Sequence, residues 1–159
     1  VFLSLYAEND LRLDKYFAET DEKGFRKNKK AGSNNYLCTF RVGEIYLTAA
    51  EAAARLGELS QARTRLLELM RKRYAPEAYE AKSVVVNAMD KEALVQEILD
   101  ERARELAFEG HRWFDLRRST RPRLEKVLDG TRYVLEENDA RYTLAIPKEA
   151  IEANPGLLN

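Results

Sequence analysis

The stretch ERARELAFEGHRWFDLRR, residues 101–118, decides the fold of this chain, and nine of its 18 residues are charged. Glu101, Glu105 and Glu109 recur every four residues and therefore line one side of a helix. A row of like charges destabilises an isolated helix. Cations are therefore expected beside the row, and the stretch predicts a helix that is held in place by ion pairs.

This charged helix is predicted to span residues 90–118. Asp90 is a suitable N-cap, and Gly110 marks a kink or a point of close packing. The helix should end before Pro122. Apolar residues at helical spacing mark its inner side: Leu94, Ile98, Leu106 and Trp113.

The partners of the acidic row are predicted from spacing and from the neighbouring helix. The expected pairs are Glu101–Arg104, Arg102–Glu105 and Glu109–Arg112, with Arg41 as a further cation. Carboxylates one helical turn apart lie about 6 Å from each other, close to the separation in retaining glycosidases. Arginines nearby would keep these acids ionised, whereas a general acid needs a raised pKa. The ion-pair interpretation is therefore favoured over a hydrolase that uses Glu101, Glu105 or Glu109.

Residues 41–75 predict two antiparallel helices joined by a short turn, an αα-hairpin. Gly57 is expected as the C-cap of the first helix and Ser60 as the N-cap of the second, which Pro76 stops. One apolar face of the first helix comprises Ile45, Ala49, Ala52, Ala53 and Leu56. The second helix continues with Ala62, Leu66, Leu69 and Met70.

The remaining segments are less regular. Residues 1–40 form an irregular lead-in, with a short helical or turn pattern at 10–17 and an exposed, lysine-rich polar loop at 21–35. Residues 77–89 are ambiguous between helix and strand. Residues 119–159 are turn-rich: they contain a short helical segment at 124–128, strand-like runs at 133–135 and 142–146 that predict a small hairpin, and a final helical turn at 148–153. The predicted fold is mainly α, with irregular loops.

Composition excludes several functions. The 27 Lys and Arg residues balance the 27 Asp and Glu residues, so the chain lacks the basic excess of a nucleic-acid binder. Apolar residues make up 45% of the chain, enough for one modest core, and no run approaches the roughly 20 apolar residues of a membrane span. The single Cys38 excludes an internal disulfide framework and a cysteine-based zinc cluster, and it has no basic partner that would mark a nucleophile.

We predict no metal site, no cofactor and no catalytic residue. His111 is the only histidine, and with Asp115 it would supply two ligands of a weak metal site. An ordinary surface or interhelical histidine is the favoured interpretation. Exposed aromatic rings stack on sugars, but Trp113 and Phe114 are predicted in the core, and five tyrosines are predicted to be half-buried packing residues: Tyr6, Tyr16, Tyr36, Tyr79 and Tyr133.

The motifs together resemble the SusD/RagB family. Residues 41–52 look like its "LRxAEvYLxxAEA" helix, and residues 101–118 look like its "ERxxELxFEGxRwxDLxR" helix. The element Asp10 to Phe17 and the closing segment Tyr142 to Pro155 also follow the family's order. Residues 57–62 resemble the core of a tetratricopeptide repeat. Gly43 stands where the family usually has Ala.

The resemblance implies a function. Family members are outer-membrane lipoproteins of Bacteroidetes-type bacteria that bind glycans, or in some cases peptides, and pass them to a SusC-like TonB-dependent transporter. They are not enzymes, and the shared motifs do not include ligand-binding residues. It also implies that residues 1–159 are a single C-terminal domain of a longer, surface-exposed, lipid-anchored protein. A peptide- or protein-binding helical-repeat module and a glycoside hydrolase remain the alternatives.

Overall fold

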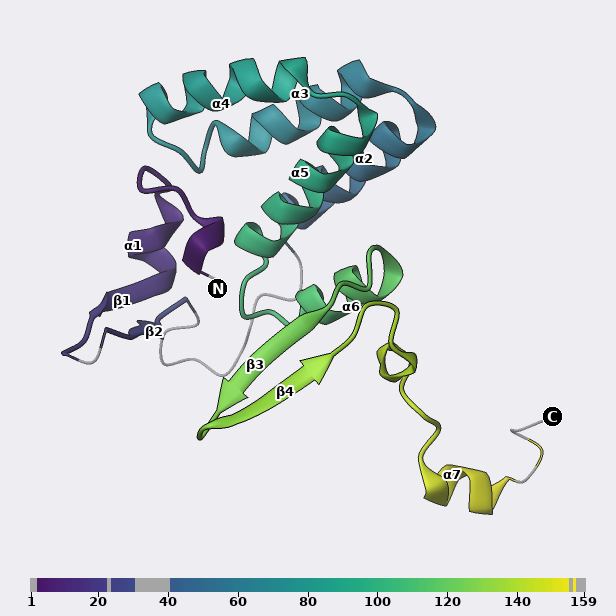
Figure 1. Ribbon diagram of the computed structural model, residues 1–159. Coiled ribbons are helices and arrows are strands. Elements are labelled where there is room, and N and C mark those ends of the chain that lie inside the picture. The colour runs from purple at the N-terminus through teal and green to yellow at the C-terminus, as the bar shows by residue number, and fades with distance from the viewer. Residues whose placement is uncertain (1–2, 23, 31–40, 155, 157–159) are drawn as a thin grey trace. The chain divides into compact units, whose positions relative to one another are not determined.

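The structure is a computed structural model that describes residues 3–22, 24–30, 41–154 and 156. The predicted mainly-α fold is confirmed: helices dominate, with a small antiparallel hairpin near the C-terminus (Figure 1). Cys38 and Tyr36 lie outside the described residues. The chain divides into two compact units, Val1–Arg112 and Trp113–Asn159, and each is described by itself.

The first unit contains the lead-in and the main helices. Its elements are the 3-10 helix η1 (Leu3–Leu5), α1 (Arg12–Tyr16), β1 (Phe17–Thr20), β2 (Arg26–Asn28), α2 (Val42–Leu56), α3 (Leu59–Met70), α4 (Pro76–Ala88), α5 (Lys91–Glu105) and the start of α6 (His111–Arg118). Strands β1 and β2 pair antiparallel, with Phe17 opposite Asn28. The part predicted as a polar loop at 21–35 therefore includes a short strand.

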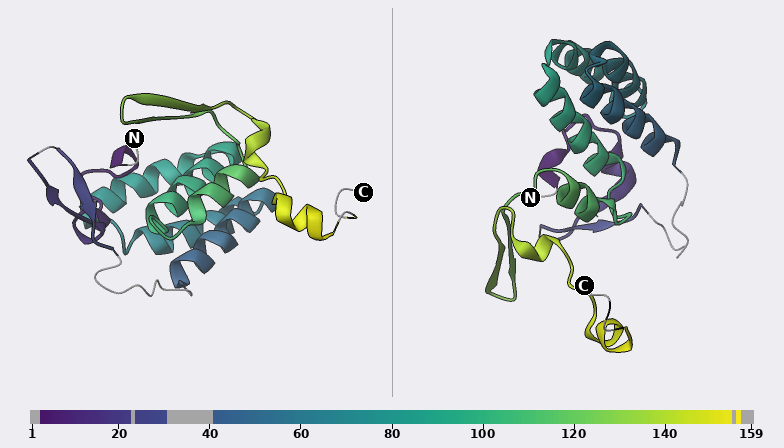
Figure 2. Two further views of the ribbon diagram at one scale, coloured as in Figure 1. Left: turned by 90° about the horizontal axis from the view of Figure 1, so that it is seen from below. Right: turned by 90° about the vertical axis from the view of Figure 1, so that its right-hand side faces the viewer.

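The core of this unit lies between α2, α3 and α5. Helix α2 packs against both of the others, and the three lie side by side (Figure 2). The fully buried side chains of the core come from all three helices: Leu47, Ala50, Ala54, Ala62, Leu66, Met70, Leu94 and Ile98. Small alanines on α2 and α3 allow the helix axes to approach closely, because the interaxial distance depends on side-chain size.

The α2–α3 turn confirms one predicted cap and corrects the other. Gly57 adopts φ 86°, and its N–H donates to the carbonyls of Ala53 and Ala54, as in a left-handed C-cap. Ser60 is not an N-cap, because α3 already begins at Leu59, after Glu58. The left-handed Gly57 reverses the chain so sharply that the second helix starts earlier than predicted.

The predicted apolar face of α2 is not the face that packs. Of its members, only Ala53 is buried, whereas Ile45, Ala49, Ala52 and Leu56 are exposed. The buried residues of α2 are Gly43, Leu47, Ala50, Glu51, Ala53 and Ala54. Helix α2 is apolar on two sides, so its periodicity alone does not select the side that faces α3 and α5.

The ambiguous segment at 77–89 forms helix α4. Pro76 occupies its first turn, where a missing N–H costs nothing, so this proline opens a helix, and α3 already ends at Met70. In the β-branched run at 84–86, only Val86 is buried. Packing against α3 therefore outweighs the weak strand preference of three valines.

The charged stretch forms two helices, so the prediction of one continuous helix over 90–118 is wrong. Helix α5 begins at the predicted cap, where Asp90 accepts a hydrogen bond from the Ala93 N–H at 2.9 Å, and ends at Glu105. Phe108 and Gly110 then adopt φ 66° and φ 84°. A left-handed residue cannot continue a right-handed helix, and α6 therefore starts anew at His111.

The second unit contains the rest of α6, β3 (Leu124–Leu128), β4 (Thr131–Leu135), the 3-10 helix η2 (Ala140–Tyr142) and α7 (Lys148–Ala153). The hairpin exists, but its strands are β3 and β4. Residues 124–128 are not helical, and residues 142–146 are not a strand. Asp129 and Gly130 both have positive φ, which is the two-residue turn that favours this pairing.

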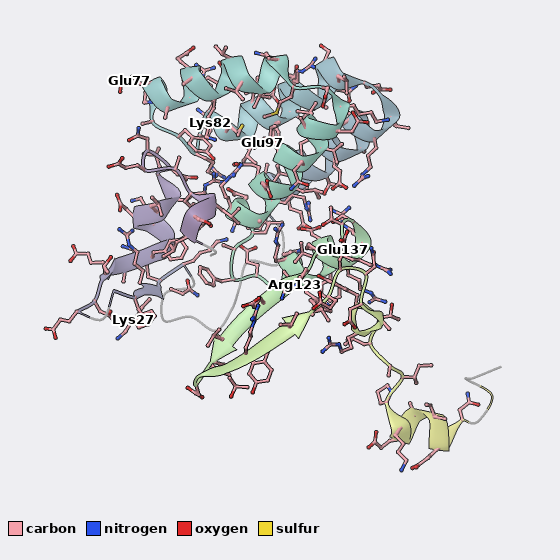
Figure 3. All side chains as sticks on the ribbon, in the orientation of Figure 1. Lys27, Glu77, Lys82, Glu97, Arg123 and Glu137 are labelled. Atoms are coloured by element: carbon pink, nitrogen blue, oxygen red, sulfur yellow. The ribbon has the colours of Figure 1, made fainter. Side chains whose placement is uncertain are left out.

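Aromatic stacking and exposed ion pairs stabilise the second unit. Trp113 stacks on the buried Tyr142 with ring centroids 5.1 Å apart, and the Tyr142 hydroxyl donates to the Pro122 carbonyl at 2.5 Å. Phe114, predicted in the core, is 61% exposed. Arg123, at the start of the hairpin (Figure 3), pairs with Glu125 at 3.0 Å.

Replacing Gly57 by Ala should lower the free energy of unfolding by about 1 kcal/mol, because a Cβ is strained at its positive φ. The space beside Gly57 is open, so the loss would come from the backbone alone. Urea unfolding measures it. Gly57→Asn is the control and should lose less, since Asn tolerates this conformation. Equal stability of Gly57→Ala and the wild type would contradict the assignment.

Candidate functional site

The acidic row, defined as Glu101, Glu105 and Glu109, is the candidate site because it gathers the most concentrated charge in the chain. Glu101 and Glu105 lie on α5 and are completely buried, and the Glu109 side chain, just beyond the helix, is 6% exposed. Burial of three ionised carboxylates costs free energy unless each one is paired with a cation or accepts hydrogen bonds. Their partners therefore determine what the site does.

Glu101 is bound by two arginines and a tyrosine. Its Oε1 accepts from Arg12 Nη1 at 2.7 Å, and its Oε2 accepts from Arg104 Nε at 2.8 Å and from the Tyr74 hydroxyl at 3.2 Å. Burial alone would raise the pKa of Glu101, but Arg12 and Arg104 outweigh it and hold that pKa below its ordinary value. Glu101 is therefore an ionised structural acid.

Glu105 is bound by three arginines from three different parts of the chain. Arg73 donates through Nε to Oε2 at 2.7 Å and through Nη2 to Oε1 at 2.9 Å, a bidentate pair. Arg41 Nη2 donates to Oε1 at 2.7 Å, and Arg12 Nη1 donates to Oε2 at 3.2 Å. Against the effect of burial, the arginines lower the pKa of Glu105 to about 2.

Arg12 joins the lead-in to the helices. Its Nη1 bridges Glu101 and Glu105, its Nε and Nη2 donate to Asp10 at 2.9 and 2.8 Å, and Nη2 also donates to the Tyr74 hydroxyl at 3.1 Å. All five of its N–H donors are therefore used. Two backbone hydrogen bonds also join the lead-in to the segment after α3. The Leu11 N–H donates to the Arg73 carbonyl, and the Ala75 N–H donates to the Asn9 carbonyl.

Glu109 is held by Lys30 and by Arg41, whose Nη1 donates to its Oε1 at 2.6 Å. Lys30 also donates to the carbonyls of Glu105 and Ala107 at 2.7 and 3.1 Å, at the C-terminal end of α5. A cation is favoured there by the helix dipole. Burial lowers the pKa of Lys30. Lys30 is thus packed into the first unit rather than solvated in a loop.

Two of the predicted partners are confirmed and two are replaced. Glu101–Arg104 forms, and Arg41 serves as the neighbouring cation. Arg102 instead reaches α2, where it lies 3.6 Å from Glu44 Oε1 and donates to the Thr48 hydroxyl at 3.2 Å. Glu109 pairs with Arg41 and Lys30 rather than with Arg112, because the chain leaves the helical path after Glu105.

Gly43 makes room for the Glu105 carboxylate. A Cβ at this position would lie 2.8 Å from Glu105 Oε1, closer than real Cβ contacts. The departure from the family's usual Ala therefore has a physical reason in this chain. The first turn of α2 therefore approaches the Glu105 carboxylate directly. Arg41, just before this turn, donates to the same carboxylate.

The assembled charges balance, which argues against acid catalysis. The ion-pair network comprises five carboxylates and five cations: Asp10, Glu97, Glu101, Glu105 and Glu109 with Arg12, Lys30, Arg41, Arg73 and Arg104. Figure 3 shows Glu97, the outermost of these acids, on α5, where it pairs with Arg104 at 2.5 Å. A general acid needs a raised pKa, and the pKa values of Glu101 and Glu105 are lowered. The arrangement is that of a scaffold.

The other candidate residues do not gather into a site. His111 Nδ1 lies 3.6 Å from Glu44 Oε1, and Asp115 pairs with Arg118 at 2.7 Å. Within the described ranges, no group of three or more His, Cys, Asp or Glu residues is arranged to hold a metal ion.

The tyrosines also differ from one another. Tyr6 is buried and donates to the Arg104 carbonyl at 2.7 Å. Tyr16 and Tyr79 are half-buried, as predicted, and Tyr133 is exposed on β4.

Sequence reasoning missed Arg12, Lys30 and Arg73 as members of the network. Their partners in the acidic row lie 32 to 93 residues away, so helical spacing gives no signal for them. The available signal was the row of like charges itself, which predicts cations beside it but does not say from which part of the chain they come.

Replacing Glu105 by Ala should lower the free energy of unfolding by about 3–5 kcal/mol, because it leaves Arg73 without its carboxylate partner and removes one of the carboxylates that bind Arg12 and Arg41. Chemical denaturation measures the loss. Glu68→Ala, which removes an exposed pair with Arg65, is the matched control and should cost less than about 1 kcal/mol. Similar losses for the two variants would show that the network does not stabilise the fold.

Stability should fall in acid because the folded protein lowers the pKa of Glu105 from 4.5 to about 2. The contribution of this ionised group is complete above the unfolded pKa and is lost as the pH falls toward the folded pKa. Melting temperature measured from pH 7 to pH 2 should therefore drop mainly below about pH 5. Glu105→Gln should flatten that drop, and an identical pH profile for both proteins would contradict the assignment.

Comparison with known proteins agrees with this architecture. The fold is similar to the crystal structure of a SusD-like carbohydrate binding protein from Bacteroides vulgatus ATCC 8482, with a TM-score of 0.65 and 20% sequence identity over 98% of this chain and 40% of that chain. The chain thus spans well under half the length of that protein. No curated protein matches the sequence. A model of the SusD family matches residues 5–159, and the chain therefore belongs to the SusD family.

Proposed function

We propose that this protein binds oligosaccharide or polysaccharide at the outer-membrane surface, without cleaving it, and delivers it to a SusC-like TonB-dependent transporter. The observation that carries the proposal is the match to the SusD family over residues 5–159. The similar solved structure, whose described role is carbohydrate binding, supports the ligand class. A lipid anchor on the cell surface follows from the same family resemblance. Among the described residues, no helix has the length and apolar character needed to cross a membrane.

The ion-pair network supports a non-catalytic role. Glu101 and Glu105 are buried, ionised and bound by arginines, so they lack the raised pKa of a proton donor. Their oxygens are occupied by side chains of the same chain. Ligand contacts are therefore expected from exposed side chains elsewhere, through aromatic stacking and hydrogen bonds that contribute about 0.5–1.5 kcal/mol each.

The second candidate function is a peptide- or protein-binding helical-repeat module. It is favoured by the α2–α3 hairpin, in which Gly57 turns the chain and Ala62 is completely buried where the helices meet. Tetratricopeptide-like repeats use such hairpins to build binding surfaces. The ligand class separates the two candidates.

Calorimetric titration against a panel of oligosaccharides and a panel of unstructured peptides tests the proposal on the protein expressed from its complete gene. We expect saturable binding of at least one oligosaccharide and none of the peptides, because stacking and hydrogen bonding suit sugar rings. Chromogenic glycosides should not be hydrolysed.

Two results would contradict this function. Binding of peptides alone would favour the repeat-module alternative, and hydrolysis of a glycoside that Glu105→Gln abolishes would favour an enzyme. Delivery is tested separately: affinity purification from outer membranes should recover a TonB-dependent transporter together with the protein. If the preparation binds glycan but contains no TonB-dependent transporter, the proposed delivery step would be contradicted and the proposed glycan binding would not.

A further inference from the structure

Tyr133, on strand β4, carries an exposed aromatic ring. It is 56% exposed, and it is the only tyrosine or tryptophan among the described residues that is exposed. Three phenylalanines are exposed as well: Phe25, Phe108 and Phe114. Tyrosine differs from phenylalanine because its hydroxyl forms hydrogen bonds while its ring stacks. One side chain of this kind contacts both the apolar and the polar parts of a ligand.

The hairpin determines which side chains surround Tyr133. Strands β3 and β4 lie side by side (Figure 1), and the two-residue turn at Asp129 and Gly130 fixes a register in which Lys126 lies directly opposite Tyr133. Side chains alternate along each strand, and opposite residues share a side of the sheet. The side that carries Tyr133, here called the platform, comprises Leu124, Lys126 and Leu128 of β3 and Thr131, Tyr133 and Leu135 of β4.

The platform is an open surface with the dimensions of a short oligosaccharide. Every residue of β3 is exposed, and so are Thr131 and Tyr133. Leu124 and Leu128 lie four residues apart, which is about 13 Å along the strand, and opposite side chains are about 5 Å apart. Such a surface suits a sugar, because the apolar side of a pyranose ring stacks on an aromatic ring while the hydroxyls at its edge stay free to form hydrogen bonds.

The charges of the hairpin are divided between its two sides. The side opposite the platform comprises Glu125, Val127, Arg132 and Val134. Glu125 pairs there with Arg132 at 2.6 Å and with Arg123 at 3.0 Å. Lys126 is the charged residue of the platform, and no carboxylate in the described part of the chain forms an ion pair with its ammonium group.

The other carboxylates close to the hairpin lie outside its strands. Asp129 is in the turn, and Glu136, which follows β4, pairs with Arg123 at 3.2 Å. An anion on the platform therefore meets one ammonium group and no carboxylate from either strand. The platform thus combines an aromatic ring, apolar side chains and a single positive charge.

We propose that the platform binds an acidic oligosaccharide, with a sugar ring stacked on Tyr133 and an anionic group of the sugar paired with Lys126. The ring and the ammonium group belong to one cross-strand pair, so they contact the same sugar or two neighbouring ones. A neutral glycan would leave the Lys126 ammonium group without an ion-pair partner. This inference rests on the proposed function, because it names the class of glycan and two residues that contact it.

Calorimetric titration of the protein expressed from its complete gene tests the ligand class. The probes are oligomers of galacturonate, alginate and chondroitin sulfate. Methyl-esterified oligomers of the first two, and unsulfated, methyl-esterified chondroitin, are the neutral counterparts of equal length. At low salt, at least one acidic oligomer should bind about two- to fivefold more tightly than its neutral counterpart, and added salt should reduce the difference because exposed ion pairs are screened.

Variants of the hairpin test the location. Tyr133→Thr removes the ring but keeps a residue that suits a strand, and it should weaken binding of the acidic oligomer about five- to tenfold. Tyr133→Phe keeps the ring and should lose less, which separates loss of stacking from loss of the hairpin. Lys126→Gln should weaken binding about two- to fivefold and abolish the preference over the neutral counterpart. Val127→Thr, on the opposite side, is the matched control and should bind as the wild type does.

Three results would overturn this inference. They are binding of neutral oligomers alone, binding of acidic oligomers that Tyr133→Thr and Lys126→Gln leave unchanged, and binding of a polyglutamate peptide to the platform in place of every sugar. The first two leave the proposed glycan binding intact, whereas a protein that binds no sugar contradicts both. Failure of the proposed function and failure of this inference are therefore distinguishable.

Discussion

The contact between Glu105 and three arginines is the constraint on which the rest of the first unit depends. Arg12 comes from the lead-in, Arg41 from the residue before α2, and Arg73 from the segment after α3. One buried carboxylate therefore joins segments that are far apart in sequence. Because each arginine is partly or fully removed from water, removal of the carboxylate would leave Arg73 without its carboxylate partner and would weaken the pairing of Arg12 and Arg41. Gly43 is the steric counterpart of this contact, since it lets α2 approach Glu105.

Local features of the fold were predictable from the sequence, and distant ones were not. Gly57 and Asp90 form hydrogen bonds only with backbone groups three or four residues away, so residue type and position predicted both caps. The partners of Glu105 could not be predicted, because spacing within one helix says nothing about Arg12 or Arg73. The exposed side of α2 was not predictable either, since its alanines suit burial on either side. The break after Glu105 depends on the positive φ of Phe108, which sequence does not reveal in a bulky residue.

The dense charge of this chain stabilises the fold. Whether a carboxylate is structural or catalytic matters for the function. A row of glutamates one helical turn apart resembles the acid pair of a glycosidase in sequence, but the two differ in pKa. Catalysis needs one acid that is protonated near neutral pH, whereas Arg41 and Arg73 keep Glu105 ionised down to about pH 2. The oxygens of Glu101 and Glu105 are already bound by arginines of the same chain, which is consistent with a protein that binds a ligand without altering it.

The bonds of Arg12 also restrict the order in which the chain folds. Its contact with Glu101 spans 89 residues, so the lead-in cannot complete its pairing until α5 has left the ribosome. Until then Arg12 can bind only Asp10, the Tyr74 hydroxyl and solvent, and the Tyr74 hydroxyl still lacks its acceptor Glu101. Closure of such long loops slows folding. Docking of α5, which supplies two carboxylates to Arg12, is therefore a late step in the folding of the first unit.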